Sequence, residues 1–140
     1  MKLNMLHSSI IALAVLLTGC STEPDNSSQL FRNSPQLFRV KVDSIQHATS
    51  VALNDTVTLR MYGVIGGDGC HSFSHFKENK QSLRLDIEVW GTRSPARICS
   101  AVMVYLNGKQ YKFIAYQRGK LYINIHQPDG SVLTDSVLVQ

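Results

Sequence analysis

The chain has 140 residues, of which 44% are hydrophobic and 17% are charged, and this balance predicts one small domain with a core of its own. With only 4 prolines and 9 glycines, the composition is neither that of a disordered chain nor that of a fibrous one. The formal net charge of +4 comes from 14 Lys and Arg residues scattered among 10 acids, without a basic run. Because nucleic acids are bound by clustered positive charge, we expect no nucleic-acid partner.

The first twenty residues have the pattern of an export signal. Lys2 gives a positive start, residues 10–17 form a short apolar stretch, and the segment closes with Leu17-Thr18-Gly19-Cys20. This ending resembles the lipobox of bacterial lipoprotein signal peptides. The resemblance implies cleavage before Cys20, a diacylglycerol on the Cys20 sulfur, and attachment to a membrane through lipid. The alternative is a secretory signal or signal anchor with an incidental cysteine, although the apolar stretch is short for about 30 Å of hydrocarbon.

The signal predicts three parts: a lipoprotein signal peptide over residues 1–19, a lipidated tether over 20–36, and a folded domain over 37–140. The tether is rich in Ser, Asn, Asp and Pro, as linkers are. The residue after Cys20 is Ser21. In the sorting rule of enteric bacteria, Asp at this position retains a lipoprotein in the inner membrane, so Ser21 resembles a signal for the outer membrane. Glu23 and Asp25 resemble the export signal of Bacteroidetes surface lipoproteins. We therefore expect a lipid-anchored location in the bacterial cell envelope, at the outer membrane, with its periplasmic or surface side left open.

From Phe38 onward the apolar residues recur at every second position, which predicts strands with one buried face. The clearest case is residues 83–90, where aliphatic residues alternate with a largely charged set. About eight strands are predicted: Phe38–Ser44, Val57–Tyr62, Cys70–Lys77, Leu83–Trp90, Cys99–Leu106, Lys109–Tyr116, Lys120–Gln127 and Val132–Val139.

Short connections join these segments. Asn107-Gly108 predicts a type I′ hairpin between its two flanking strands, and Pro128-Asp129-Gly130 predicts a second tight turn. We expect an all-β fold, an antiparallel two-sheet sandwich of about seven to eight strands and of immunoglobulin-like type, with a closed barrel as the main alternative. Residues 119–131 resemble the last hairpin of many bacterial immunoglobulin-like modules, which supports the sandwich.

Two cysteines remain once Cys20 is assigned to lipid. Cys70 and Cys99 begin two predicted strands in a compartment where thiols oxidise, so we expect a disulfide between them. The alternative is a nucleophilic cysteine with a histidine partner, but it leaves the second cysteine unexplained.

His71 and His75 follow Cys70 in a pattern that suggests a metal site. On a strand, however, four residues span about 13 Å, so the two imidazoles do not reach one zinc ion. We therefore predict no metal ligands and no other cofactor, and we assign no role to His47 or His126.

The charged face of residues 84–90 holds the remaining candidates. Asp86 and Glu88 beside Arg84 are a carboxylate pair, but on a solvated sheet face such charges usually serve solubility, and we predict no catalytic residue. Exposed aromatic residues are better suited to contact a partner. The candidate binding residues are Trp90, Tyr62, Arg84 and Arg93. In the alternative, Trp90 only covers a strand end.

The sequence thus favours a non-enzymatic envelope lipoprotein whose domain serves binding or assembly, with a protein or a glycan as partner. Two other functions stay open. One is a small secreted hydrolase or metal-dependent enzyme that uses residues 70–75, and the other is a structural component of the envelope.

Overall fold

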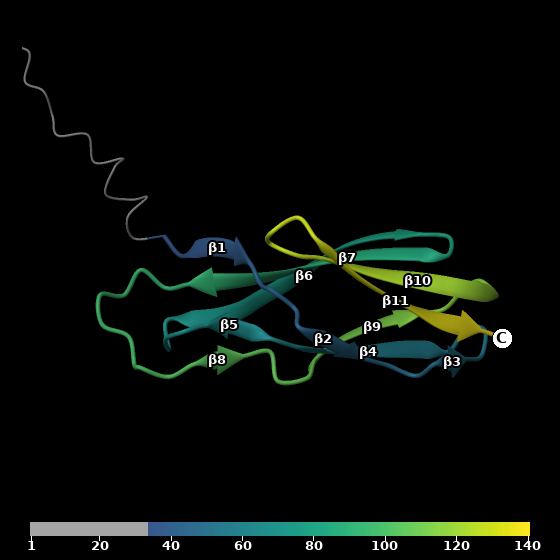
Figure 1. Ribbon diagram of the computed structural model, residues 1–140, viewed down its shortest axis with the longest axis horizontal. Coiled ribbons are helices and arrows are strands. Elements are labelled where there is room, and N and C mark those ends of the chain that lie inside the picture. Colours follow the sequence, from purple (N-terminus) through teal and green to yellow (C-terminus); the bar gives the residue numbers. More distant parts are fainter. Residues whose placement is uncertain (1–33) are drawn as a thin grey trace, which may run out of the picture.

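The computed structural model describes residues 34–140, and every element in this part is a strand (Figure 1). The signal peptide, Cys20 and nearly all of the expected tether lie outside the described residues. The strands are β1 (Gln36–Arg39), β2 (Ser44–Gln46), β3 (Ser50–Val51), β4 (Thr56–Tyr62), β5 (Val64–Gly66), β6 (His71–Gln81), β7 (Arg84–Arg93), β8 (Val104–Tyr105), β9 (Lys109–Ile114), β10 (Gly119–His126) and β11 (Val132–Val139). Between residues 34 and 140 there is no helix of the length and apolarity that a membrane crossing requires.

The strands form two main sheets that face each other, so the prediction of an all-β, sandwich-like fold is confirmed (Figure 1). The larger sheet, sheet A, contains β6, β7, β1, β10, β11 and β3, and the smaller, sheet B, has the order β2-β4-β9. A short pair, β5 with β8, extends the line of sheet B. In sheet A, β6 pairs along one edge of β7, while β1 and β10 share the other edge.

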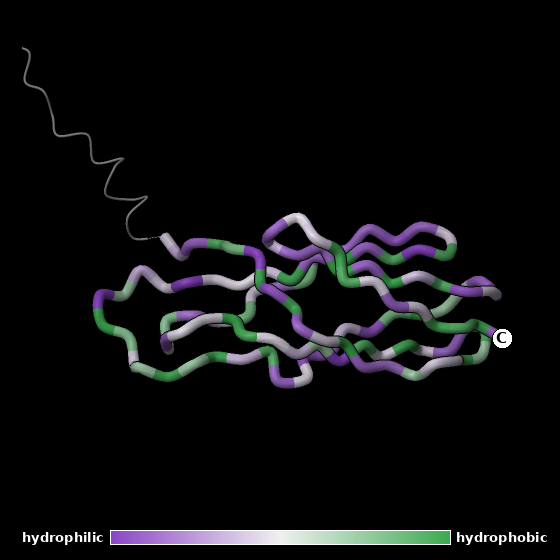
Figure 2. Tube along the Cα trace, in the orientation of Figure 1, coloured by the Kyte–Doolittle hydropathy of each residue, from purple (hydrophilic) through white to green (hydrophobic). Residues whose placement is uncertain are grey.

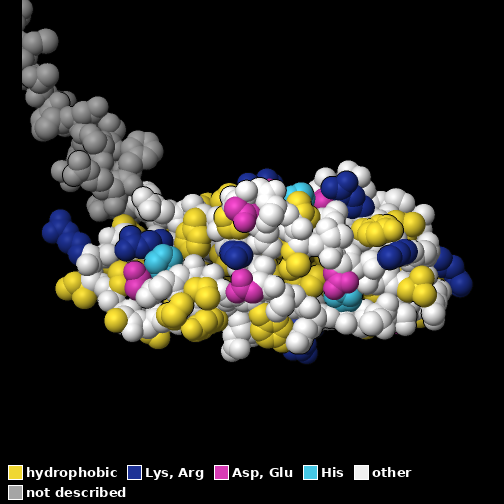
Figure 3. Space-filling view, viewed as in Figure 1, with side chains coloured by type: hydrophobic (Ala, Val, Ile, Leu, Met, Phe, Trp, Pro, Cys, Tyr) yellow, Lys and Arg dark blue, Asp and Glu magenta, His cyan; other side chains and the backbone are white. Residues whose placement is uncertain are grey.

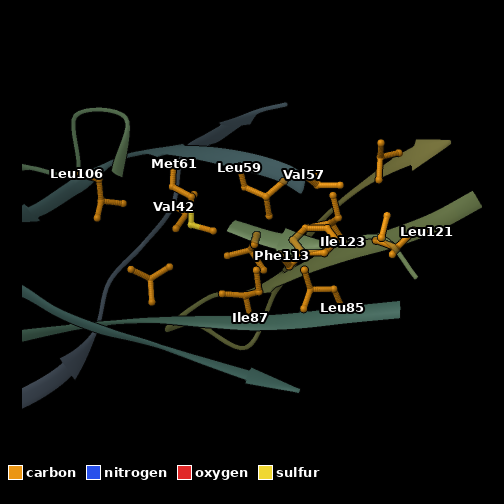
Figure 4. Packing of buried hydrophobic residues seen from close by; sticks show 14 of the residues in the cluster. Val42, Val57, Leu59, Met61, Leu85, Ile87, Leu106, Phe113, Leu121 and Ile123 are labelled. Atoms are coloured by element: carbon orange, nitrogen blue, oxygen red, sulfur yellow. The ribbon is translucent and has the colours of Figure 1, made fainter. Parts of the chain in front are cut away.

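Apolar and polar residues alternate along β7, so its side chains point in turn to the core and to the outer face of sheet A. Leu85, Ile87 and Val89 are fully buried, while their neighbours along the strand are exposed or half-buried. Figure 4 shows Leu85 and Ile87 on one side of the core, with Leu59 and Met61 of β4 on the other. Along β4 and β10 the same alternation appears in Figure 2 as hydrophobic and hydrophilic segments that follow each other along the tube. The core therefore lies between the two sheets, as expected from strands with one apolar face.

The expectation of a wholly antiparallel sandwich is wrong for two pairs. β10 runs parallel to β7, and β3 runs parallel to β11. After β7 the chain crosses to the other layer, forms β8 and β9 there, and returns as β10 beside β7. A connection that crosses layers in this way brings the second strand back in the direction of the first, whereas a hairpin reverses it.

The predicted first strand, Phe38–Ser44, is divided between the sheets. β1 pairs with β7 in sheet A, and β2 pairs with β4 in sheet B. The chain crosses the core in between, where Val40 and Val42 are buried. The buried amide of Gln127 supports this crossing, because its Oε1 accepts a hydrogen bond from the Val42 N–H at 3.0 Å and its Nε2 donates one to the Val42 carbonyl at 3.0 Å. Gln127 thus supplies the hydrogen bonds that a neighbouring strand gives elsewhere.

The predicted hairpin at Asn107-Gly108 is also absent. Both residues have positive φ, 46° and 75°, as a type I′ turn requires, and Lys109 N–H bonds to the Leu106 carbonyl. The flanking strands nevertheless pair with other partners, β8 with β5 and β9 with β4. Only Val104–Tyr105 of the predicted strand Cys99–Leu106 is a strand, since residues 94–103 have no sheet edge beside them.

The disulfide between Cys70 and Cys99 is confirmed, with the two Cα atoms 5.3 Å apart and 29 positions apart in sequence. It joins the start of β6 to the long connection between β7 and β8. A loop of this length corresponds to roughly 3.5 kcal/mol of stabilisation in the chain-entropy model. The disulfide therefore fixes a segment that few backbone hydrogen bonds hold.

Candidate functional site

The outward face of β7 carries the group of side chains that the sequence singles out. Arg84, Asp86, Glu88 and Trp90 alternate with the buried aliphatic residues and share one face of sheet A, as predicted. β6 lies along one side of β7, while on the other side β10 flanks Arg84 and Asp86 and β1 flanks Trp90, so side chains from four strands meet on this face.

Asp86 is the centre of a hydrogen-bonded network across β7 and β10. Its carboxylate accepts hydrogen bonds from Arg84 Nη2 at 2.9 Å and Asn124 Nδ2 at 3.1 Å, and lies 3.0 Å from His126 Nε2. Arg84 Nε is 2.8 Å from the other carboxylate oxygen, and Thr134 of β11 donates in turn to Asn124 at 3.1 Å. The Asp86 side chain is only 12% exposed, so hydrogen bonds from these neighbouring side chains replace most of those that water would donate to its carboxylate. The network fixes its orientation.

These contacts favour the charged form of Asp86. The hydrogen bond from Arg84 is the largest cause, and together with those from His126 and Asn124 it outweighs the opposing effect of burial and lowers the pKa of Asp86 to about 2. Asp86 is therefore ionised at neutral pH and serves as an acceptor.

Glu88 is held by a second set of contacts, one position further along the same face. Trp90 Nε1 donates to its carboxylate at 3.0 Å, and Lys77 Nζ of β6 lies 3.5 Å away. Burial alone would raise the pKa of Glu88, but the hydrogen bond from Trp90 and the charge of Lys77 outweigh it and lower that pKa.

Trp90 lies between its two cross-strand neighbours. His75 on β6 stacks against it with the ring planes 3° apart and the centroids at 6.2 Å, and Arg39 on β1 places its guanidinium 6.0 Å from the ring centroid. Trp90 is half-buried as a result. Its indole is thus fixed in orientation, and its exposed part points outward beside Glu88.

The face is hollowed beside this network. A groove of about 440 Å³ runs between β6, β7 and the end of β10. Its lining is charged or polar throughout: Lys77, Glu78, Asn79, Arg84, Asp86, Glu88 and His126. A groove of this kind offers cationic donors and carboxylate acceptors side by side, which suits a ligand with many hydroxyl, amide or charged groups.

Tyr62 and Arg93 do not join this site, so the four candidate binding residues do not form one surface. Tyr62 lies on β4 in sheet B and donates a hydrogen bond to Gln46 Oε1 at 3.1 Å. Arg93 is in register with the inward-facing residues of β7 and lies 3.7 Å from Asp68. Only Arg84 and Trp90 belong to the charged face.

The two histidines after Cys70 lie on opposite faces of β6. A register shift between Phe73 and His75 inserts one extra residue, so His71 and His75 do not share a side of the strand. His71 Nδ1 is 2.7 Å from Asp68 Oδ1, while His75 faces Trp90. The sulfurs of Cys70 and Cys99 lie near Asp68, but because they are bonded to each other they offer no thiolate to a metal or a substrate.

Sequence reasoning missed His126, Asn124 and Lys77. His126 and Asn124 alternate with the apolar residues of β10, so the pattern could place them on a polar face. It could not show that β10 pairs with β7 and brings both side chains to Asp86.

The site contains an Asp–His pair but not the rest of a hydrolytic triad. Within residues 34–140, no hydroxyl or thiol hydrogen-bonds the second ring nitrogen of His126. Nucleophilic catalysis needs such a group within hydrogen-bond reach of its base. In comparisons with known proteins, no family model, no curated protein and no solved structure matches this chain.

The low pKa of Asp86 makes a prediction for stability. A carboxyl that binds its proton less tightly in the folded state contributes stability above its ordinary pKa of about 4, and this contribution is lost as the pH falls from about 4 to about 2. We expect Asp86→Asn to remove on the order of 1 kcal/mol of the unfolding free energy at pH 7 and to flatten its decline between pH 4 and 2, as measured by urea denaturation.

The control for this prediction is Asp43→Asn, since Asp43 is exposed and forms no ion pair within the described residues. Its profile should follow that of the wild type. If the Asp86→Asn profile does the same, Asp86 is not held by the network described.

Proposed function

We propose that this chain is a bacterial envelope lipoprotein that binds a polar partner through the charged groove of sheet A, without catalysing a reaction. The lipobox at Leu17–Cys20 supports the anchor, through a diacylglycerol on Cys20. Ser21 after the cysteine supports the outer membrane as its address.

The domain is proposed to be an immunoglobulin-like module in the broad sense. Two facing sheets, short strands and a length near one hundred residues support this assignment. The parallel pair of β7 with β10 departs from the usual antiparallel pattern. Such modules commonly serve recognition or assembly, with the function located in a surface grafted on the fold.

The observation that carries the binding proposal is the groove beside Asp86, whose carboxylates are fixed by neighbouring side chains. Asp86 and Glu88 are both paired, so neither is a free acid or base. Asp86 Oδ2 contacts only Arg84, and Glu88 Oε1 has no hydrogen bond within the described residues, so each carboxylate can accept one from a ligand. Preorganised groups of this kind cost little entropy on binding. The groove is lined by hydrogen-bond donors, Lys77 and Arg84, and by an acceptor, Glu88. Hydroxyl groups both donate and accept hydrogen bonds, so a glycan of the envelope can pair with both kinds.

The enzymatic alternative has less support. The disulfide leaves Cys70 without a thiol, and the bulge in β6 separates His71 from His75. A purely structural role in the envelope gains no specific support from the described residues, because a structural spacer does not require a groove with an oriented polar lining.

The lipid anchor is tested by metabolic labelling with a radioactive fatty acid. We expect the wild type to be labelled and Cys20→Ala to be unlabelled and unprocessed, because Cys20 carries the only proposed acylation site. The double variant Cys70→Ser/Cys99→Ser is the matched control and should keep its label. Label retained in Cys20→Ala contradicts the anchor.

Binding is tested on an array of envelope glycans that includes peptidoglycan disaccharide peptides and lipopolysaccharide core oligosaccharides. Arg84→Ala should weaken the retained glycan at least tenfold, about 1.4 kcal/mol, because Arg84 lines the groove and orients Asp86. Arg60→Ala, an exposed arginine on β4 of the opposite sheet, should leave the affinity unchanged. Binding of no glycan, or equal losses for the two variants, rejects the groove as a glycan site.

A further inference from the structure

The connection between β7 and β8, together with Tyr105 of β8, exposes large hydrophobic side chains at one end of the molecule. Ile98 is 92% exposed, Val102 52%, Met103 49% and Tyr105 54%. We refer to these four residues as the apolar tip. Figure 3 shows hydrophobic side chains gathered at this end, over β5 and β8. Exposed apolar residues are common singly, but a group of them on one projecting loop indicates contact with an apolar phase or a partner.

The described chain begins at the same end. β1 pairs Gln36 with Arg93, the last residue of β7, and a small cavity is lined by Ser34 and Gln36 together with Arg93, Ser94 and Pro95. The loop that carries the apolar tip starts at Ser94. The C-terminus lies at the opposite end of the domain (Figure 1). A tether that leaves from residue 34 therefore leaves beside the tip.

The tip is also cationic. Residues 93–105 contain Arg93 and Arg97 and no acid. Asp68, which lies beside the disulfide, is engaged by His71 at 2.7 Å and by Arg93 at 3.7 Å. Arg97 is exposed and has no ion pair within residues 34–140. Apolar side chains beside unpaired positive charge match the interface of a bilayer with anionic lipid headgroups.

We propose that the apolar tip inserts into the interfacial layer of the anionic bilayer to which Cys20 is anchored, so that the domain stands end-on against the membrane. This inference rests on the proposed lipid anchor. The fourteen residue-to-residue steps from Cys20 to Ser34 reach at most about 50 Å, so the anchor confines the tip near the bilayer and makes a weak second contact effective. The disulfide holds the loop with Ile98 outward before contact, which lowers the entropy lost on insertion.

A bilayer fits the tip better than a second copy of the chain. The tip is formed by a projecting loop and the adjoining Tyr105 of β8. A patch of four side chains, on the order of a few hundred Å², falls short of the roughly 800 Å² per partner that stable protein interfaces bury. Shallow insertion into lipid needs no complementary surface, and its strength scales with the apolar area inserted.

The test uses the single tryptophan of the chain. Trp90 is replaced by Phe, and an indole is introduced by Ile98→Trp at the tip or by Leu138→Trp, an exposed position near the C-terminus. Each full-length protein is expressed with fatty-acid label, purified and reconstituted in vesicles of phosphatidylethanolamine and phosphatidylglycerol that contain brominated acyl chains. The bromine quenches only an indole that enters the acyl region. We expect quenching for Ile98→Trp and none for Leu138→Trp. Adding Arg97→Gln to the Ile98→Trp variant should lower the equilibrium constant for insertion of the tip, measured from this quenching, roughly fivefold.

Each combination of label and quenching decides between the two proposals. Label with quenching at Ile98→Trp supports both the anchor and the insertion. Label without quenching overturns the insertion and leaves the anchor, and quenching without label overturns the anchor and supports the insertion. If neither label nor quenching is observed, both the anchor and the insertion are overturned. An introduced indole that is shielded from aqueous iodide but is not quenched by the lipid identifies a second copy or another protein on the tip, and this also overturns the insertion.

Discussion

The strict alternation of apolar and polar residues along β7 determines both the core and the position of the candidate site. Leu85 and Ile87 face the core, while Asp86 and Glu88 face the solvent, because successive side chains of a strand point to opposite sides. A shift of one residue would bury the carboxylates and expose the aliphatic residues, so the register is strongly specified. The same register that forms the core therefore also lines up the candidate site across β6, β7 and β10.

The groove and the apolar tip are held by different means, and this separates the two proposed contacts. Around the groove, a continuous sheet and the network of Asp86 fix the side chains. At the apolar tip, the loop of residues 94–103 has few backbone hydrogen bonds and is held chiefly by the disulfide from Cys70 to Cys99. A groove built on a rigid sheet suits a ligand of defined shape. A disulfide-linked loop suits a bilayer, because insertion requires exposed apolar side chains but no fixed arrangement of them.

Local pattern accounts for the fold class and for the face of β7, but not for the partners of each strand. The period of two predicted the strand of Leu85. The disulfide was predicted because only two cysteines remain after Cys20 and an exported domain is expected to oxidise them. The parallel pairing of β7 with β10 depends on a path through the other layer, which no local pattern specifies. His126 was missed for this reason. Asn107-Gly108 shows the reverse case, since its dihedral angles were predicted and its pairing was not.

The inner face of β7 provides stability, and its outer face is the one that we propose for recognition. The free energy of unfolding of Trp90→Ala compared with that of Ile87→Ala tests this division without knowledge of any ligand. Ile87 is fully buried, so its truncation should cost about 2 to 5 kcal/mol. Trp90 is half-buried and loses one hydrogen bond and one stacked ring, so its truncation should cost less than about 2 kcal/mol. A loss of about 3 to 5 kcal/mol for Trp90→Ala, as for a buried ring, would make Trp90 a structural residue and contradict the account.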